Sequence, residues 1–177
     1  MKKLQILFIF ILILSSCTSV DKTNNIPSLK IENFTFVSPI YSNQENAKTI
    51  NFFNRYKNYT TKQIDTLFKN NNKLPSQLML EGKQNEIKNI FEAVKKNDPI
   101  KLSEKIKSET ANEKHVAFTK IEPTIEGKSY VMSCKFEMVI LDVKSDEIVF
   151  YGESTSKVAG YGKQLHKSFK RVYSMLK

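Results

Sequence analysis

Arginine and tryptophan are scarce or missing in this 177-residue chain, and the shortage of arginine restricts what its positive charge can bind. Arginine supplies only two of the 28 basic residues, Arg55 and Arg171, and tryptophan is absent. Arginine forms the bidentate forks that recognise phosphate, whereas lysine is a solvated point charge. Although the net charge is +10, we therefore expect a solvated, lysine-rich surface and no nucleic-acid partner.

Cysteine and histidine are also rare, with two of each. Cys134 lies in an apolar run and is expected to be a small buried hydrophobe. If Cys17 carries lipid, one thiol remains, which excludes a disulfide scaffold. That thiol with His115 and His166 is too small a ligand set for a structural metal site. The sequence therefore predicts no metal and no cofactor.

Catalytic motifs are missing as well: the chain has no Gly-x-Ser-x-Gly, Walker loop, Cys-x-x-Cys or His-Glu-x-x-His. Asp142 and Asp146 bracket a predicted turn, and turn chemistry explains both carboxylates without catalysis. His166 is expected on the polar face of a helix. We predict a protein that is not an enzyme, and an enzyme using Asp142, Asp146 or His166 is the alternative.

The N-terminus has the pattern of a secretory leader. Lys2 and Lys3 precede an apolar stretch of 11 residues, Leu4–Leu14, which only Gln5 interrupts. A membrane-spanning helix needs about 20 apolar residues, so a cleaved signal over residues 1–16 is favoured. Loss of the two lysines lowers the net charge from +10 to +8.

The leader ends in Leu14-Ser15-Ser16-Cys17, which resembles the lipobox of bacterial lipoproteins. The resemblance implies that signal peptidase II recognises Leu14, Ser15 and Ser16, and that acyl chains are attached to Cys17. Two or three acyl chains give stable membrane anchoring. Thr18 replaces the Asp that favours inner-membrane retention in enteric-type bacteria, so the outer membrane (periplasmic leaflet or cell surface) is expected.

The mature chain divides into a tether and one domain. Residues 17–28 are expected to be the lipidated cysteine with a polar, flexible tether, and residues 29–177 a single globular domain. Within the domain we expect a strand over 29–40, one or two helices over 50–67 and a short strand over 74–80. A helix ending near Asn97 follows, and Asp98-Pro99 is expected to begin another.

The C-terminal half predicts three antiparallel strands over 115–159 and an amphipathic helix from about Tyr161. We therefore predict an α+β (mixed α/β) fold. Its sheet is an antiparallel three-stranded meander plus an N-terminal strand, covered by three to four helices that include the C-terminal amphipathic one.

The segment Leu141–Tyr151 is similar to a strand-turn-strand pattern in curli-secretion lipoproteins and in lipoprotein activators of penicillin-binding proteins. In that pattern an Asp ends one strand, and a Gly-Glu pair lies in the turn. The resemblance implies an α/β domain that binds partner proteins and has no catalytic residues to transfer. This chain departs from the pattern at Asp146, where Gly is usual.

The outer face of the last helix is basic, with Lys163, His166, Lys167, Lys170 and Arg171. Lys163, Lys167, Lys170 and Arg171 either contact anionic lipid headgroups or cell-wall polymers, or form a solvated face favoured by the helix dipole. The expected function is a non-enzymatic binding or scaffolding protein of the cell envelope. Its partners are the membrane, through the lipid, and another envelope protein; the alternative is a surface-exposed lipoprotein that binds host or environmental ligands.

Overall fold

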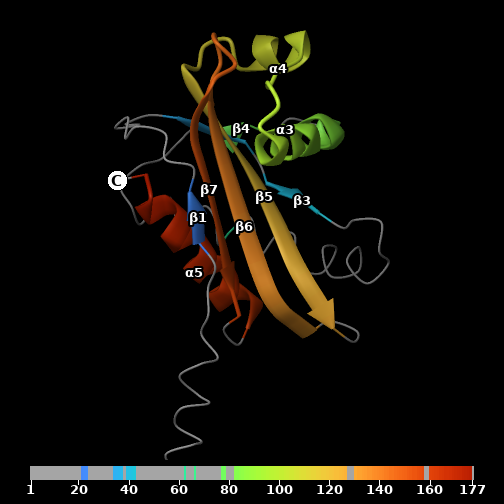
Figure 1. The fold of residues 1–177 in the computed structure, drawn as a ribbon, viewed down its shortest axis with the longest axis vertical. Coiled ribbons are helices and arrows are strands. Elements are labelled where there is room, and N and C mark those ends of the chain that lie inside the picture. Colours follow the sequence, from blue (N-terminus) through green and yellow to red (C-terminus); the bar gives the residue numbers. More distant parts are fainter. Residues whose placement is uncertain are drawn as a thin grey trace, which may run out of the picture.

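The computed structural model (Figure 1) describes residues 21–23, 34–37, 39–42, 62, 66, 77–78, 82–126, 130–157 and 160–176. The predicted leader and lipobox lie outside the described residues. Of the helix expected over 50–67, only Lys62 and Thr66 are described, and both are helical. Most of the described residues therefore belong to the C-terminal half of the chain.

The described strands form one sheet in the order β1-β7-β6-β5-β2-β4, and β3 also pairs with β5. β5, β6 and β7 pair antiparallel, whereas β2 and β3 run parallel to β5. With its helices this is a mixed α+β architecture, as the sequence predicted. The strand bounds are β1 Asp21–Thr23, β2 Thr35–Val37, β3 Ile40–Tyr41, β4 Gln77–Leu78, β5 His115–Glu126, β6 Tyr130–Asp142 and β7 Ile148–Ser156.

Two of the predicted strands lie only partly within the described residues. The strand expected over 29–40 includes β2 and the first residue of β3, and Pro39, which directly precedes β3, is not in a strand. Proline has no N–H to donate to a ladder, so it favours such an interruption. Of the strand expected over 74–80, Gln77 and Leu78 are described, and they form β4.

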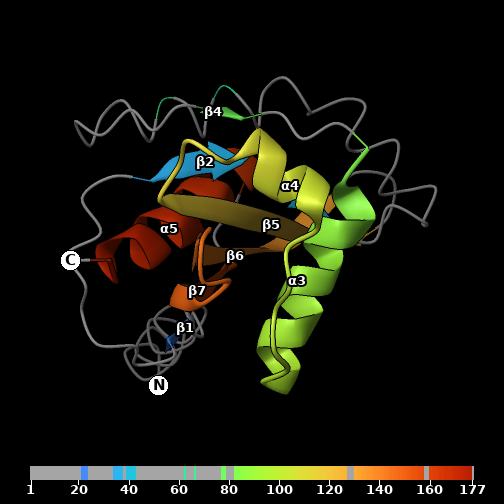
Figure 2. The ribbon, with the colours of Figure 1, turned by 90° about the horizontal axis from the view of Figure 1, so that it is seen from above.

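Three described helices, α3 Gln84–Lys96, α4 Glu104–Glu109 and α5 Tyr161–Ser174, pack on the sheet. Figure 2 shows α3 and α4 on one side of the long strands and α5 on the other. Strand residues alternate between the two faces. Both faces of the long strands carry buried apolar residues. Ala117, Phe136 and Met138 belong to the cluster that contains α5, and Phe118 and Val139 to the cluster that contains α3.

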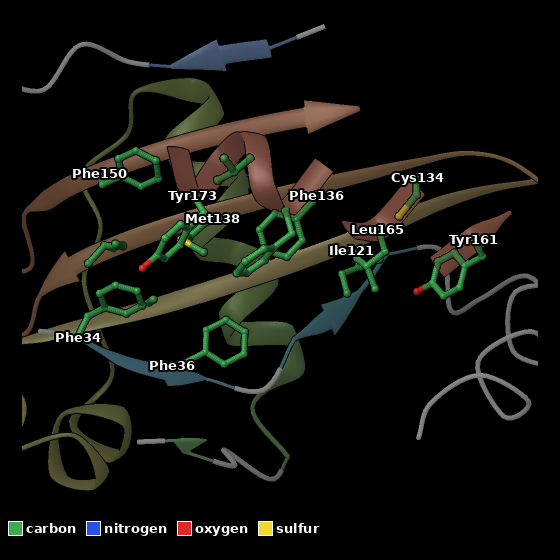
Figure 3. Packing of buried hydrophobic residues seen from close by; sticks show 14 of the residues in the cluster. Phe34, Phe36, Ile121, Cys134, Phe136, Met138, Phe150, Tyr161, Leu165 and Tyr173 are labelled. Carbon is green, nitrogen blue, oxygen red and sulfur yellow. The ribbon is translucent and has the colours of Figure 1, made fainter. Parts of the chain in front are cut away.

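The core under α5 is rich in aromatic rings (Figure 3). The rings of Phe136 and Phe169 meet edge to face with centroids 5.3 Å apart, and Phe169 stacks on Tyr173 at 5.8 Å. These geometries are the favoured ones for aromatic pairs. The predicted apolar stripe of the last helix thus joins α5 to β6.

The start of α4 differs from the prediction that Asp98 caps a helix beginning at Pro99. The Asp98 N–H instead donates to Ala93 O at 2.9 Å, and Asn97 has φ 56°, which is how a helix commonly ends. Asp98 therefore belongs to the end of α3. Ser103 caps α4, because its hydroxyl accepts the N–H of Ile106 at 3.3 Å.

The tether prediction is wrong at three residues. Asp21, Lys22 and Thr23 form β1, which pairs antiparallel with β7. A polar segment without periodicity gives no strand signal of its own, and the free edge of β7 supplies the pairing. The chain is therefore joined to the sheet before residue 29.

Candidate functional site

The ionisable side chains on the α3 face of the sheet form a group with strongly shifted pKa values. Lys120 on β5, Glu137 on β6 and Glu153 on β7 lie in one cross-strand row. The side chain of Glu137 is fully buried and that of Lys120 is 5% exposed. Charged groups this deep are tolerated only when they are paired.

Glu137 is surrounded by three lysines. Its Oε1 lies 3.1 Å from Lys135 Nζ and 3.2 Å from Lys95 Nζ, and Lys120 Nζ is 3.2 Å from Oε2. Lys120 also lies 5.9 Å from the centroid of the Phe91 ring, in cation–π range. Burial acts to raise the pKa of Glu137, but the ammonium groups of Lys120, Lys135 and Lys95 outweigh it and lower that pKa to about 2.

The network extends to β7 through Tyr151 and Glu153. The Tyr151 hydroxyl donates to Glu153 at 2.7 Å and lies 3.3 Å from Glu137, while Lys135 Nζ is 2.7 Å from Glu153. Burial, followed by the bond to Glu153, raises the pKa of Tyr151 far above its usual range. For Lys135, burial acts to lower the pKa, but the two carboxylates outweigh it and raise it.

This charge network is poorly suited to proton transfer. A general acid or base works best when its pKa lies near the operating pH. Here the pKa of Glu137 is moved down, and those of Tyr151, Lys135 and Lys95 are moved up, so all four shifts lead away from neutrality. The arrangement is that of a structural ion-pair network, which also perturbs pKa values. Sequence patterns did not identify it, because only the strand register aligns these residues.

The turn between β6 and β7 is held by Asp142. Its Oδ1 accepts the backbone N–H groups of Lys144 at 2.9 Å and Ser145 at 3.1 Å, so turn chemistry explains this carboxylate. Asp146 has φ 57° and pairs with Lys107 Nζ at 2.7 Å. Asp tolerates this left-handed conformation, which glycine adopts most easily. The geometry therefore accommodates Asp146 at the place where the sequence departs from Gly.

The structure does not bring the two histidines together. His115 Nε2 is 3.9 Å from Asp142 Oδ2, and this imidazole is only partly exposed. His166 is exposed on α5. Ser168, two residues further along α5, donates to Cys134 O, which places this part of the helix near the start of β6, whereas His115 lies at the end of β6 beside Asp142. Asp142, Asp146 and His166 therefore do not form one constellation.

The remaining sequence-predicted residues are placed as follows. Cys134 is fully buried, as expected, and burial raises the pKa of its thiol to about 12. On α5, Lys163 and Lys170 are exposed, while Lys167 and Arg171 are partly covered. Leu14, Ser15, Ser16 and Cys17 lie outside the described residues.

Two further features bear on the predicted classes. Among the described residues, no group of three or more His, Cys, Asp or Glu side chains is arranged to hold a metal ion. None of the described helices is both long and apolar enough to cross a membrane.

No protein-family profile and no curated protein matches this sequence. Among solved structures, the PelC dodecamer from Paraburkholderia phytofirmans is similar at a TM-score of 0.50 and 9% identity, over 90% of this chain and 97% of that chain. A point variant of this PelC dodecamer in another crystal form gives 0.50 and 10%, over 90% and 98%. Similarity at these identities concerns the fold alone.

Proposed function

We propose that this chain is a lipid-anchored, non-enzymatic binding or scaffolding protein of a bacterial cell envelope. The segment Leu14-Ser15-Ser16-Cys17, which resembles a lipobox, carries the proposal. The pairing of β1 with β7 determines how close to the membrane such an anchor would hold the sheet. Three residues separate Cys17 from Asp21, and the four steps of chain between the two span at most about 14 Å. A lipid on Cys17 would therefore hold the folded sheet close to the bilayer surface instead of at the end of a long flexible tether.

The absence of enzymatic activity is supported by the charge network. Its four shifted groups are held in their ordinary charge states at neutral pH, and they contact one another. A site prepared for acid–base chemistry shifts its pKa values toward the working pH instead.

The finer architecture and location belong to the same proposal. The complete domain is a three-stranded antiparallel meander with an N-terminal strand, covered by three to four helices, one of them within 50–67. The protein resides at the outer membrane, and its partner is another envelope protein. In the alternative, the domain is displayed at the cell surface and binds host or environmental ligands.

Fractionation of cells that express Cys17→Ser tests the anchor, with Cys134→Ser as the matched control. The wild-type and Cys134→Ser proteins are expected in the membrane fraction, and Cys17→Ser in the soluble fraction. Equal membrane association of Cys17→Ser would contradict the proposal.

Crosslinking in cells followed by affinity capture should recover a stoichiometric partner. Protease treatment of intact cells separates the surface-displayed alternative from a periplasmic protein.

A second candidate is self-assembly. Both similar PelC structures are dodecamers, and the outer edge of β7 supports self-assembly of this chain. Within the described residues, β1 covers only Gly152–Ser154 of β7, and an uncovered edge is suited to strand addition. Light scattering of the detergent-solubilised protein is expected to give a multiple of the chain mass; a strictly monomeric mass would remove this candidate.

A further inference from the structure

The direction of β1 indicates which end of the sheet lies close to the anchor. Asp21 pairs with Ser154 and Thr23 with Gly152. Followed from Thr23 back to Asp21, β1 therefore points toward Ser156, where β7 ends. The first turn of α5 lies at the same end, which is the lower end of the sheet in Figure 1. With at most about 14 Å of chain between Cys17 and Asp21, a lipid on Cys17 stays near this end.

An exposed apolar side chain projects from the same end. The β5–β6 ladder pairs Thr124 with Ser133 and Ile125 with Val131, so Met132 is the extra residue of a β-bulge. Met132 is 44% exposed and is the one large exposed hydrophobic side chain in the described part of the chain. The Gln164 side-chain amide on α5 donates to Val131 O at 3.0 Å and to Met132 O at 3.3 Å, which ties the bulge to the helix.

Exposed lysines accompany Met132. Lys157 directly follows β7, and Lys163 lies in the first turn of α5. Glu126 is the exposed carboxylate at this end of β5, so the described exposed charge there is net positive. An apolar side chain and lysines at one end of a domain are suited to the interface of an anionic bilayer, where each lysine near the surface contributes about 1 kcal/mol.

We propose that Met132, Lys157 and Lys163 form a docking surface for the anionic lipid headgroups of the bilayer that holds the Cys17 acyl chains. This inference rests on the proposed lipidation of Cys17 and deepens it by giving the domain an orientation. The β6–β7 turn, at the opposite end, faces away from the membrane. Of the basic residues on α5, Lys163 faces the headgroups, whereas Lys170 and Arg171 lie about 10–12 Å further along the helix.

The orientation is tested with the acylated, mature full-length protein in vesicles of equal parts phosphatidylcholine and phosphatidylglycerol. A nitroxide label is attached to Met132→Cys or, as the matched control, to Ser145→Cys in the exposed β6–β7 turn. Cys134 is fully buried and does not compete for label. We expect the label at 132 to be relaxed by oxygen more than by a nickel chelate, as in lipid, and the label at 145 to show the reverse. An aqueous signal at 132, or an immersed one at 145, would overturn the orientation.

The lysines are tested in the same assay with the label at 132. Lys157→Gln and Lys163→Gln are each expected to lower the ratio of docked to undocked protein about fivefold. Vesicles of phosphatidylcholine alone should also lower this ratio for the wild-type lysines. Lys144→Gln, at the far turn, is the control and should change nothing. An unchanged ratio in both docking-surface variants would overturn the role of the headgroups.

Intact mass separates the two proposals. Missing acyl chains refute the anchor, whereas an acylated protein with an aqueous label at 132 refutes only the docking.

Discussion

The carboxylate of Glu137 illustrates how one buried residue depends on its neighbours. It is fully buried between three lysines, and removing one member of a buried ion cluster leaves the others uncompensated. We expect Glu137→Gln to lower the free energy of unfolding by about 3–5 kcal/mol, measured by denaturant titration. Glu126→Gln, on an exposed residue of the neighbouring strand, is the control and should change it little.

The same comparison has a defined pH dependence. The folded-state pKa of Glu137 is lowered from 4.5 to about 2, so its ionised form stabilises the native state above the higher value. The stability difference between wild type and Glu137→Gln should be constant above pH 4.5 and shrink as the pH falls toward 2. A difference that grows on acidification would contradict this assignment.

Cys134 gives a second prediction for a single residue. Its thiol is fully buried with a pKa raised to about 12, and the thiolate is the reactive form. Ellman's reagent at pH 8 should therefore leave the native protein unmodified and react with Cys134 only after denaturation. Rapid reaction in the native state would show that this part of the core opens to solvent.

The start of α4 is fixed by a side-chain cap and by a contact with α3. Ser103 accepts the Ile106 N–H through its hydroxyl and donates its own N–H to Glu86 of α3 at 2.9 Å. Ser103→Ala should cost about 1 kcal/mol of stability. Asp98→Ala is the matched control, because the sequence pattern predicted Asp98 as the cap. A larger cost for Asp98→Ala would contradict the observed cap.

The contact between α5 and β7 depends on a glycine. A Cβ at position 152 would lie 2.7 Å from the ring of Phe150 and 3.2 Å from Val172 of α5. Overpacking of a core costs about 1–3 kcal/mol, so Gly152→Ala should destabilise by this amount. In a Phe150→Leu background the cost should fall, because the closest ring atom is gone. Equal costs in both backgrounds would show that this contact is not the cause.

The elements differ in how well their sequences predicted them. α3, α5 and the strands β5, β6 and β7 carry long apolar patterns of the right period, so the sequence predicted their type and approximate position. β1 and α4 have short or polar sequences, and their positions depend on contacts with β7 and with Glu86. Such contacts are not visible in a local pattern.

For the whole molecule, the sequence predicted the mixed α+β class but not the charge network. Glu137, Lys120 and Glu153 are distant in the chain, and only the register of three strands places them in one row. The strand formed by Asp21–Thr23 was missed for a similar reason. The resemblance of Leu14-Ser15-Ser16-Cys17 to a lipobox, in contrast, is a local pattern that needs no tertiary contact, and the proposed anchoring follows from it.

Intact-mass spectrometry of the protein purified from membranes of its native host is the most direct test of the anchor. We predict a chain that begins at Cys17 and carries the added mass of two or three acyl chains, with a tandem spectrum that assigns this mass to Cys17. A mature protein with a free thiol at Cys17, or a chain that retains residues 1–16, would contradict lipid anchoring.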